Sequence, residues 1–137
     1  MEQNNNECIF CKIINNEVSA HKVYEDREFI AFLDVNPASE GQTLVIPKKH
    51  IDYIFNLDET TYIKLMSLSK NIAKAIDKSL QTKRTILLVE GLEVPHVHVR
   101  LHPYYGGRNN FVPKEPSPKE EELKQTSEKI KTNISGF

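Results

Sequence analysis

The sequence predicts an α+β domain: a mainly antiparallel five-stranded sheet, with one long helix between the third and fourth strands and a further C-terminal helix. Three observations predict this fold class. Short runs rich in branched apolar residues are separated by turn residues. The apolar period becomes helical between about residues 58 and 80. Strand-like runs then resume, and they end in a segment in which apolar and polar residues alternate. This order of elements is typical of one sheet covered by helices.

Composition narrows the class of protein. The 137 residues are 39% hydrophobic and 27% charged, which suits one compact domain. Eighteen basic residues nearly balance nineteen acidic ones, so a broad electrostatic footprint for nucleic acid is not evident. No apolar run is long enough to span a bilayer, and residues 1–7 are polar rather than a hydrophobic signal segment. We therefore expect a cytoplasmic protein that binds neither nucleic acid nor membranes.

The N-terminal half contains three predicted strands. Residues 1–7 are expected to form a mobile N-terminus, and residues 8–14 a short helical turn or knuckle that ends at two asparagines. Strands are then predicted at 22–25, 29–35 and 43–46. The second of these is apolar on both faces, as a central strand is. Proline and glycine mark residues 36–41 as a loop, and Pro47 stops the third strand.

A long helix is predicted from Asp58 to about Leu80. Its apolar residues recur at helical spacing, and Asp58 or Thr60 is a candidate N-cap. The apolar stripe is wide enough to cover a sheet, so the segment is interpreted as a core helix. A fourth strand follows at 85–89, then a turn at Gly91 and the alternating segment.

Prolines mark a change of character after residue 112. The main domain is predicted to span residues 8–112, followed by a Pro-rich linker and a charged helical tail at 113–137. Leu123, Ile130 and Ile134 would share one side of a helix within 118–134. Five lysines and five glutamates make this tail neutral, and its sequence indicates no chemistry.

The segment from Val94 to Pro103 is the candidate active site. If it is a strand, Val97, Val99 and Leu101 face one side, while His96, His98, Arg100 and His102 face the other. The second face cannot be buried against hydrocarbon without a large desolvation cost, and its positive charges would repel one another. An anion or a metal ion lying along this face would make the arrangement favourable.

Cys8 and Cys11 have the spacing of a pair of zinc ligands. Zinc prefers tetrahedral sets of thiolate and imidazole, and this chain has five histidines to complete the set: His21, His50, His96, His98 and His102. A redox pair and two ordinary buried thiols are the alternatives. A redox motif is expected after a strand, whereas a polar stretch precedes this one, and two unpaired thiols would leave the histidines unexplained. In a reducing compartment a disulfide is disfavoured.

Three stretches resemble the histidine triad (HIT) family, in its branch of small bacterial zinc-containing hydrolases. They are residues 8–14, residues 32–50 with the run Pro47-Lys48-Lys49-His50, and residues 94–98. The resemblance covers roughly residues 8–112. It implies a HIT-like fold and a homodimer formed through the long helix and a strand. It also implies a hydrolase or nucleotidyl transferase acting on a purine nucleoside phosphoramidate, a dinucleoside polyphosphate or a related ester.

The resemblance also implies a role for each matching residue. His98 would be the nucleophile that attacks the α-phosphorus, forming a covalent nucleotidyl-histidine that passes to water or another acceptor. Asp34 would hold the ribose hydroxyls, although it could instead form the turn before Pro37. The residues that would enclose the base are Phe10, Phe32 and Leu33, and those that would bind a structural zinc ion are Cys8, Cys11, His50 and His96.

The first departure from the family pattern lies in the triad. Arg100 stands at the third histidine and His102 at the last apolar position. Arginine offers donors for a phosphate oxygen but cannot act as a proton-donating acid, so we expect it to clamp phosphate. Pairing of Arg100 with Glu90 or Glu93 is the alternative. Protonation of the leaving group would then fall to His102, to a water or to nothing.

The second departure lies just before the triad. Leu92 and Glu93 replace the glutamine and hydroxyl residue that contact phosphate in the family, which would weaken charge stabilisation in the transition state. A zinc-stabilised nucleotide-binding protein with weak or no catalysis is therefore the alternative function, and a structural interaction protein is a third. Of the remaining residues, His102 is expected to be an exposed strand-end residue and His21 to have no role. Lys48 and Lys49 are expected to be solvated charges.

Overall fold

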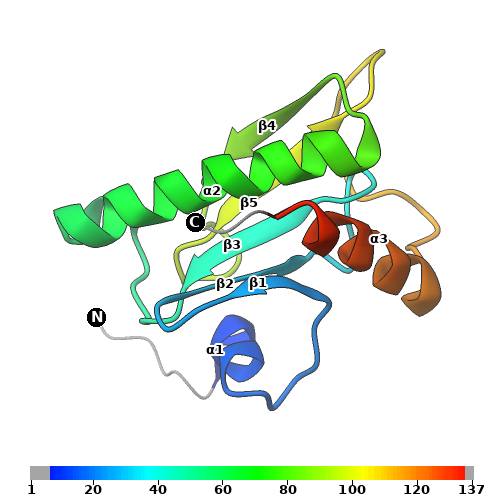
Figure 1. The fold of residues 1–137 in the computed structure, drawn as a ribbon. Coiled ribbons are helices and arrows are strands. Elements are labelled where there is room, and N and C mark those ends of the chain that lie inside the picture. The colour runs from blue at the N-terminus through cyan, green and yellow to red at the C-terminus, as the bar shows by residue number, and fades with distance from the viewer. Residues whose placement is uncertain (1–6, 135–137) are drawn as a thin grey trace.

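The computed structural model describes residues 7–134, so the predicted mobile N-terminus lies outside the described residues apart from Glu7. It contains the predicted five-stranded antiparallel sheet, with strand order β1-β2-β3-β5-β4 (Figure 1). The elements in chain order are α1 (Ile9–Ile14), β1 (Lys22–Glu25), β2 (Phe29–Leu33), β3 (Thr43–Pro47), the 3₁₀ helix η2 (Ile54–Asn56), α2 (Glu59–Leu80), β4 (Arg84–Leu88), β5 (Val99–Tyr104) and α3 (Glu120–Thr132).

The sheet has a core on each face. All five residues of β2 are buried, and successive side chains enter opposite cores because a strand alternates. Phe29, Ala31 and Leu33 pack into the larger core, together with residues of α2 and α3. Ile30 and Phe32 pack into the smaller core, together with α1. Figure 1 shows α1 on its own below the sheet.

Helix α2 forms as the sequence pattern predicts. Of the two candidate caps, Asp58 is the N-cap: its side chain accepts a hydrogen bond from the Thr61 N–H at 3.1 Å. The helix ends at Gln81, which adopts a left-handed conformation with φ 52°. Its buried stripe is Leu65, Leu68, Ser69, Ile72, Ala75 and Ile76. Within residues 7–134, no helix is long and apolar enough to cross a membrane.

Strand β5 begins at Val99, five residues later than the alternation suggested. Before it, the His96 N–H donates to the Val94 carbonyl at 2.8 Å, which forms a tight turn around Pro95. The Val97 N–H donates to Ile51 at 2.7 Å instead of to a neighbouring strand. Proline lacks the N–H that a ladder needs, so the chain joins the sheet only after this turn.

Helix α3 packs against the rest of the domain. Leu123 and Ile130 are buried in the same core as α2, and the Ser79 hydroxyl donates to the Lys129 carbonyl at 3.1 Å. His21, for which the sequence indicated no role, lies 2.7 Å from a carboxylate oxygen of Glu120 in the first turn of α3. The predicted charged C-terminal helix is thus present, and its apolar side faces the sheet.

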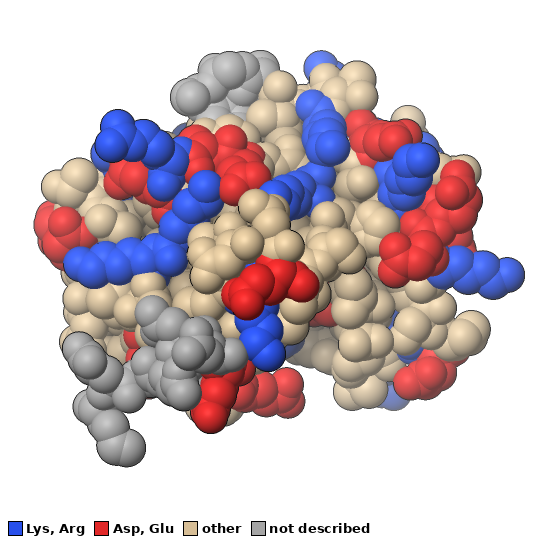
Figure 2. Space-filling model, turned by 90° about the horizontal axis from the view of Figure 1, so that it is seen from below, with Lys and Arg blue, Asp and Glu red and all other residues tan. Residues whose placement is uncertain are grey.

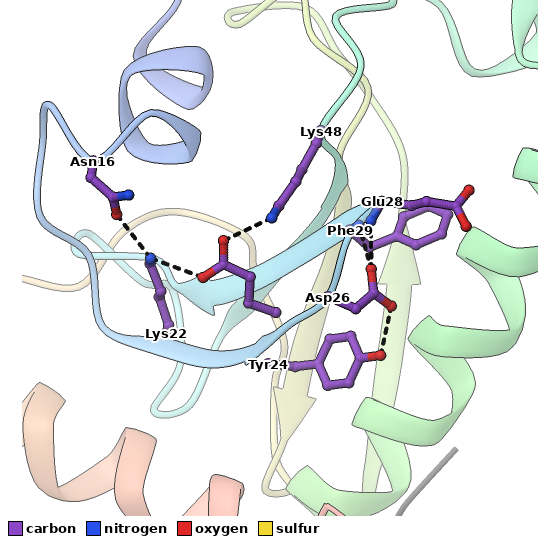
Figure 3. A network of polar contacts seen from close by, with 8 residues as sticks. Asn16, Lys22, Tyr24, Asp26, Glu28, Phe29 and Lys48 are labelled. Carbon is purple, nitrogen blue, oxygen red and sulfur yellow. Dashed lines mark hydrogen bonds and ion pairs between the residues drawn. The ribbon is translucent and has the colours of Figure 1, made fainter.

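Lys48 is not the solvated charge that the sequence suggested. Its ammonium group lies 2.9 Å from Glu25, whose other oxygen accepts from Lys22 at 3.0 Å (Figure 3). Both lysines hold the carboxyl pKa of Glu25 below its ordinary value. The pairing follows from the sheet, because Lys48 follows β3 and its side chain reaches across the start of β2 to the end of β1. Lys49 is exposed as expected.

Candidate active site and metal centre

Four metal-binding side chains from three separate segments converge beneath the sheet. The ligand atoms of Cys8, Cys11, His50 and His96 all lie within 4.8 Å of one another. The Nδ1 atoms of His50 and His96 are 3.2 Å apart, and the Cys11 sulfur lies 3.2 Å and 3.6 Å from them. A tetrahedral zinc ion with bonds of about 2.0–2.3 Å spaces its ligands about 3.3–3.8 Å apart. The donor set therefore fits zinc.

Protonation states at this cluster suit a cation. Burial lowers the pKa of His96 to about 4, so the ring is neutral. Its Nε2–H donates to the Pro47 carbonyl at 2.7 Å, which leaves the Nδ1 lone pair for a metal. Burial, followed by the neighbouring Cys8, raises the pKa of Cys11 to about 12. The metal-free thiol therefore resists ionisation, so a metal ion bound here would displace its proton.

His98 lies directly after this cluster, with its ring in a defined tautomer. Its Nδ1–H donates to the His96 carbonyl at 2.8 Å, which leaves Nε2 as the unprotonated nitrogen. The Phe10 ring packs edge-on against it, with the ring centroids 5.0 Å apart. Burial lowers the pKa of His98, and the Arg100 charge adds to this effect. The imidazole is therefore neutral and able to act as a nucleophile near neutral pH.

Arg100 pairs with Glu90, one of the two glutamates considered as its partner. Its Nη1 lies 3.2 Å from Glu90 Oε1, while its buried Nε has no hydrogen-bond partner among the described residues. Glu93 and Leu92 are exposed, and Leu92 is 85% exposed. The guanidinium therefore keeps an unused buried donor two residues from His98.

The predicted nucleotide-binding residues are only partly brought together. Phe10 and Phe32 pack edge to face, with their ring centroids 5.8 Å apart, and both lie on the His98 side of the sheet. Asp34 follows β2, and its charge acts on the pKa of His98. The Leu33 side chain points to the opposite core, because it neighbours Phe32 on a strand.

His102 is buried, and the prediction of an exposed strand end is wrong. It is 2% exposed, and its two ring nitrogens lie 3.2 Å from Gln42 Oε1 and 2.9 Å from Asn109 Oδ1. Its ring also packs against Phe111, with the centroids 4.7 Å apart. The chain after β5 folds back and covers this strand end, which the local sequence does not indicate.

Gln42 is the site residue that sequence reasoning missed. It is 3% exposed, and its Nε2 donates to Asp34 Oδ2 at 2.9 Å. Its Oε1 accepts from the Ala38 N–H at 3.2 Å and contacts His102. The sequence offered one indication of its role: a polar side chain directly before a strand that is wholly buried. Next to Asp34 lies a cavity of about 300 Å³ between the β2–β3 loop and the start of α3.

The charged surface around the site is mixed. Figure 2 shows the molecule from below the view of Figure 1, the side on which α1 lies, with basic and acidic side chains interspersed and no large patch of one sign.

Comparisons with known proteins identify a family. A model of the HIT domain matches residues 15–105. An uncharacterized HIT-like protein of Methanocaldococcus jannaschii is 41% identical over 112 residues, covering 77% of this chain and 84% of that protein. An adenosine 5′-monophosphoramidase of Schizosaccharomyces pombe is 32% identical over 132 residues, covering 93% and 98%. The crystal structure of a hypothetical histidine triad nucleotide-binding protein from Sulfolobus tokodaii aligns with a TM-score of 0.85 at 33% identity, covering 93% of this chain and 91% of that one.

Proposed function

Because the chain belongs to the HIT family, we propose that it is a nucleotide hydrolase or nucleotidyl transferase whose nucleophile is His98. The substrate class is a purine nucleoside phosphoramidate, a dinucleoside polyphosphate or a related ester, and the first of these is in keeping with the name of the Schizosaccharomyces pombe relative. The observation that carries the proposal is the His98 tautomer, fixed by the 2.8 Å hydrogen bond from Nδ1 to the His96 carbonyl. A lone pair on Nε2 is what attack on phosphorus requires.

The reaction divides one displacement into two. His98 Nε2 attacks the α-phosphorus, and the bond to the leaving group breaks with its electron pair going to that group. Water then attacks phosphorus, the P–N bond breaks with its pair returning to Nε2, and the water proton passes to solvent. Arg100 stabilises charge on the phosphoryl oxygens.

The nucleoside is proposed to lie along the α1 side of the sheet. Asp34 would accept hydrogen bonds from the ribose hydroxyls. Its carboxylate is oriented by the hydrogen bond that Gln42 donates to one of its oxygens. Phe10 and Phe32 offer apolar faces to the base. Leu33 supports this site only from the other core, where its side chain lies.

A structural zinc ion is proposed at Cys8, Cys11, His50 and His96. The spacing of the four donor atoms supports it. When bound, the ion would supply cross-linking rather than reaction chemistry, because four protein ligands leave no open position. It would tie α1 to the segment that carries His98.

A homodimer is also proposed, through the face formed by η2, the start of α2 and β4. Phe55 is 70% exposed, Ile63 56% and Leu87 40%. A hollow of about 260 Å³ on this face is lined mainly by apolar and aromatic residues, with Asp52 and Glu90 among them, and reaches His98. Exposed apolar side chains gathered in this way are typical of an interface.

A zinc-stabilised nucleotide-binding protein with weak or no catalysis is the second candidate. It is favoured by the ion pair between Glu90 and Arg100, because the Glu90 carboxylate offsets part of the positive charge with which Arg100 would stabilise the transition state.

Release of AMP from adenylyl substrates separates the two candidates. The full-length protein, a His98→Ala variant and a His21→Ala control are incubated with adenosine phosphoramidate and with adenosine 5′-phosphosulfate. We expect the full-length protein and His21→Ala to release AMP, and His98→Ala to release it at least 10³-fold more slowly. No release, with AMP still binding in calorimetry, would favour the binding protein. A mass increase of one adenylyl group on His98 would support the covalent step.

A further inference from the structure

Among the described residues, the leaving group of the proposed reaction meets no strong general acid: Tyr53 and Tyr62 line the hollow that reaches His98, and a phenol is a much weaker acid than an imidazolium. The charged groups that act on His98 are Arg100, Asp34 and Glu90. An arginine in a protein does not give up its proton, and carboxylates are ordinarily ionised near neutral pH. The residues just before the triad, Leu92 and Glu93, carry no hydroxyl and are exposed.

His102 is too far away to serve as the acid. It lies four residues beyond His98, which is about 13 Å along an extended chain. Both of its ring nitrogens are occupied, by Gln42 and by Asn109. A proton on His102 therefore cannot reach an atom bonded to the phosphorus that His98 attacks.

Arg100, by contrast, is close enough to contact a negatively charged leaving group. It is two residues from His98 on the same side of the chain, about 7 Å along an extended backbone, and its long side chain spans that distance. The Glu90 contact engages Nη1 but leaves the buried Nε without a partner. An anionic oxygen would satisfy that donor.

We propose that this site acts on nucleotidyl groups joined to the anion of an acid, and discriminates against those joined to an amine or an alcohol. This inference rests on the proposed function of His98. The favoured substrates are mixed anhydrides of AMP with sulfate, a phosphate chain or a carboxylate. Arg100 is the residue that determines this specificity.

The two kinds of substrate differ in their proton requirement. When the α-phosphorus is attacked in a mixed anhydride, the P–O bond breaks and its electron pair remains on the sulfate, phosphate or carboxylate oxygen. That anion is stable without a proton, and Arg100 pairs with its charge. An amine or alcohol must take up a proton as its bond to phosphorus breaks, and general acids that supply one contribute about 10²–10⁴-fold in rate.

The test compares kcat/KM for two adenylyl compounds, using the full-length, metal-loaded protein. Adenosine 5′-phosphosulfate and adenosine phosphoramidate share the AMP group and differ in the leaving group. We expect the sulfate to be preferred by at least about 100-fold. In Arg100→His, which introduces a possible acid, that preference should fall at least tenfold, mainly through faster release from the phosphoramidate. Arg100→Gln should lower kcat/KM for adenosine 5′-phosphosulfate without raising kcat/KM for adenosine phosphoramidate. Arg27→His, at an exposed turn, is the matched control.

A second measurement needs only the wild-type protein. Across a series of aryl esters of AMP, the rate should rise steeply with the acidity of the leaving phenol, because no proton assists its departure. A flat dependence would overturn the inference, as would equal use of the sulfate and the phosphoramidate; both leave the function of His98 intact. A preference unchanged in Arg100→His would overturn the role of Arg100. Failure to release AMP from any compound would overturn the proposed function, and this inference with it.

Discussion

The side chain of Asp34 is oriented through a chain of hydrogen bonds that ends at His102. Gln42 donates to Asp34 with its amide nitrogen, and its oxygen lies 3.2 Å from His102 Nδ1. Both ring nitrogens of His102 face amide oxygens, those of Gln42 and Asn109, and burial lowers the pKa of His102. This arrangement fixes which way the Gln42 amide faces and which Asp34 oxygen it holds, while the other oxygen, Oδ1, accepts from the Asn36 N–H at 2.9 Å.

Replacing Gln42 with methionine should therefore impair recognition of the ribose. We expect the ratio of the Kd for 2′-deoxy-AMP to the Kd for AMP to fall about fivefold, the equivalent of one hydrogen bond. Calorimetry with both nucleotides measures this ratio. Gln125→Met, on the exposed side of α3, is the control. If both nucleotides weaken equally, Gln42 merely supports the fold and does not orient Asp34.

At the scale of elements, α1 is too short to be stable alone. It has six residues, whereas isolated helices shorter than about 12–15 residues are marginal in water. Cys8 caps it by accepting from the Cys11 N–H at 3.4 Å, and both cysteines belong to the candidate metal cluster. A metal ion would thus hold this helix against the sheet.

Removing the metal should release α1 before the rest of the domain. We expect purified protein to contain about one zinc per chain, as a four-ligand site requires. After chelation, or in His50→Ala, amide hydrogen exchange should accelerate at residues 9–14 while α2 keeps its protection. His21→Ala should retain the metal and the slow exchange. Equal protection of residues 9–14 with and without metal would contradict this expectation.

The turn between β1 and β2 is held by Asp26 (Figure 3). Its Oδ1 accepts from the N–H groups of Glu28 and Phe29 at 2.7 and 2.8 Å, and its Oδ2 accepts from the Tyr24 hydroxyl at 2.6 Å. Burial opposes ionisation, but these hydrogen bonds prevail and lower the carboxyl pKa. A group whose pKa is lowered in the folded state stabilises the protein above its unfolded pKa.

The contribution of Asp26 should disappear in acid. At pH 6 we expect Asp26→Asn to have a lower urea midpoint than the wild type. As the pH falls below about 3.9, the ordinary aspartate value, and then through the lower folded pKa, the two midpoints should converge. Glu17→Gln, an exposed charge change, is the comparison. A difference that persists at pH 2 would show that the side chains differ in packing rather than in charge.

For the molecule as a whole, the local spacing of apolar residues along the sequence predicted most of the fold. The apolar stripe of α2 and the alternation of Val97, Val99 and Leu101 are local patterns, and most of these side chains are buried in the core as expected. Ile63 is the exception in α2, because it is 56% exposed. The start of β5 was misplaced because Pro95 makes a turn within an alternating sequence. The donor set of the metal cluster was chosen through the family resemblance, since spacing alone identifies only the cysteine pair.

The residues that were misjudged depend on distant parts of the chain. His102 is buried because residues 105–112 return over the strand end, and Lys48 is paired because its side chain reaches across the start of β2 to the end of β1. Neither contact has a periodic pattern in the sequence. Buried polar contacts of this kind are set by the tertiary arrangement, so sequence reasoning places the residue but not its partner.

Helix α3 should unfold together with the rest of the domain. Ile130 is 0% exposed and packs in the same core as α2. Ile130→Ala should therefore lower the free energy of unfolding by about 2–5 kcal/mol, with one transition retained. Urea unfolding followed by both far-UV circular dichroism and tyrosine fluorescence measures this. Lys131→Ala, its exposed neighbour, should change little. Two separate transitions would show that α3 is an independent unit.

The proposed dimer should depend on the apolar face formed by η2, α2 and β4. Ile63 is 56% exposed and Leu87 40%, so a lysine at either position would be tolerated in a monomer but would place a charge in the interface. We expect wild-type protein to sediment as a dimer at micromolar concentration, and Ile63→Lys to shift it to a monomer with unchanged circular dichroism. Val35→Lys, at a 49% exposed position just after β2, should remain dimeric. A dimer that survives Ile63→Lys and Leu87→Lys would place the interface elsewhere.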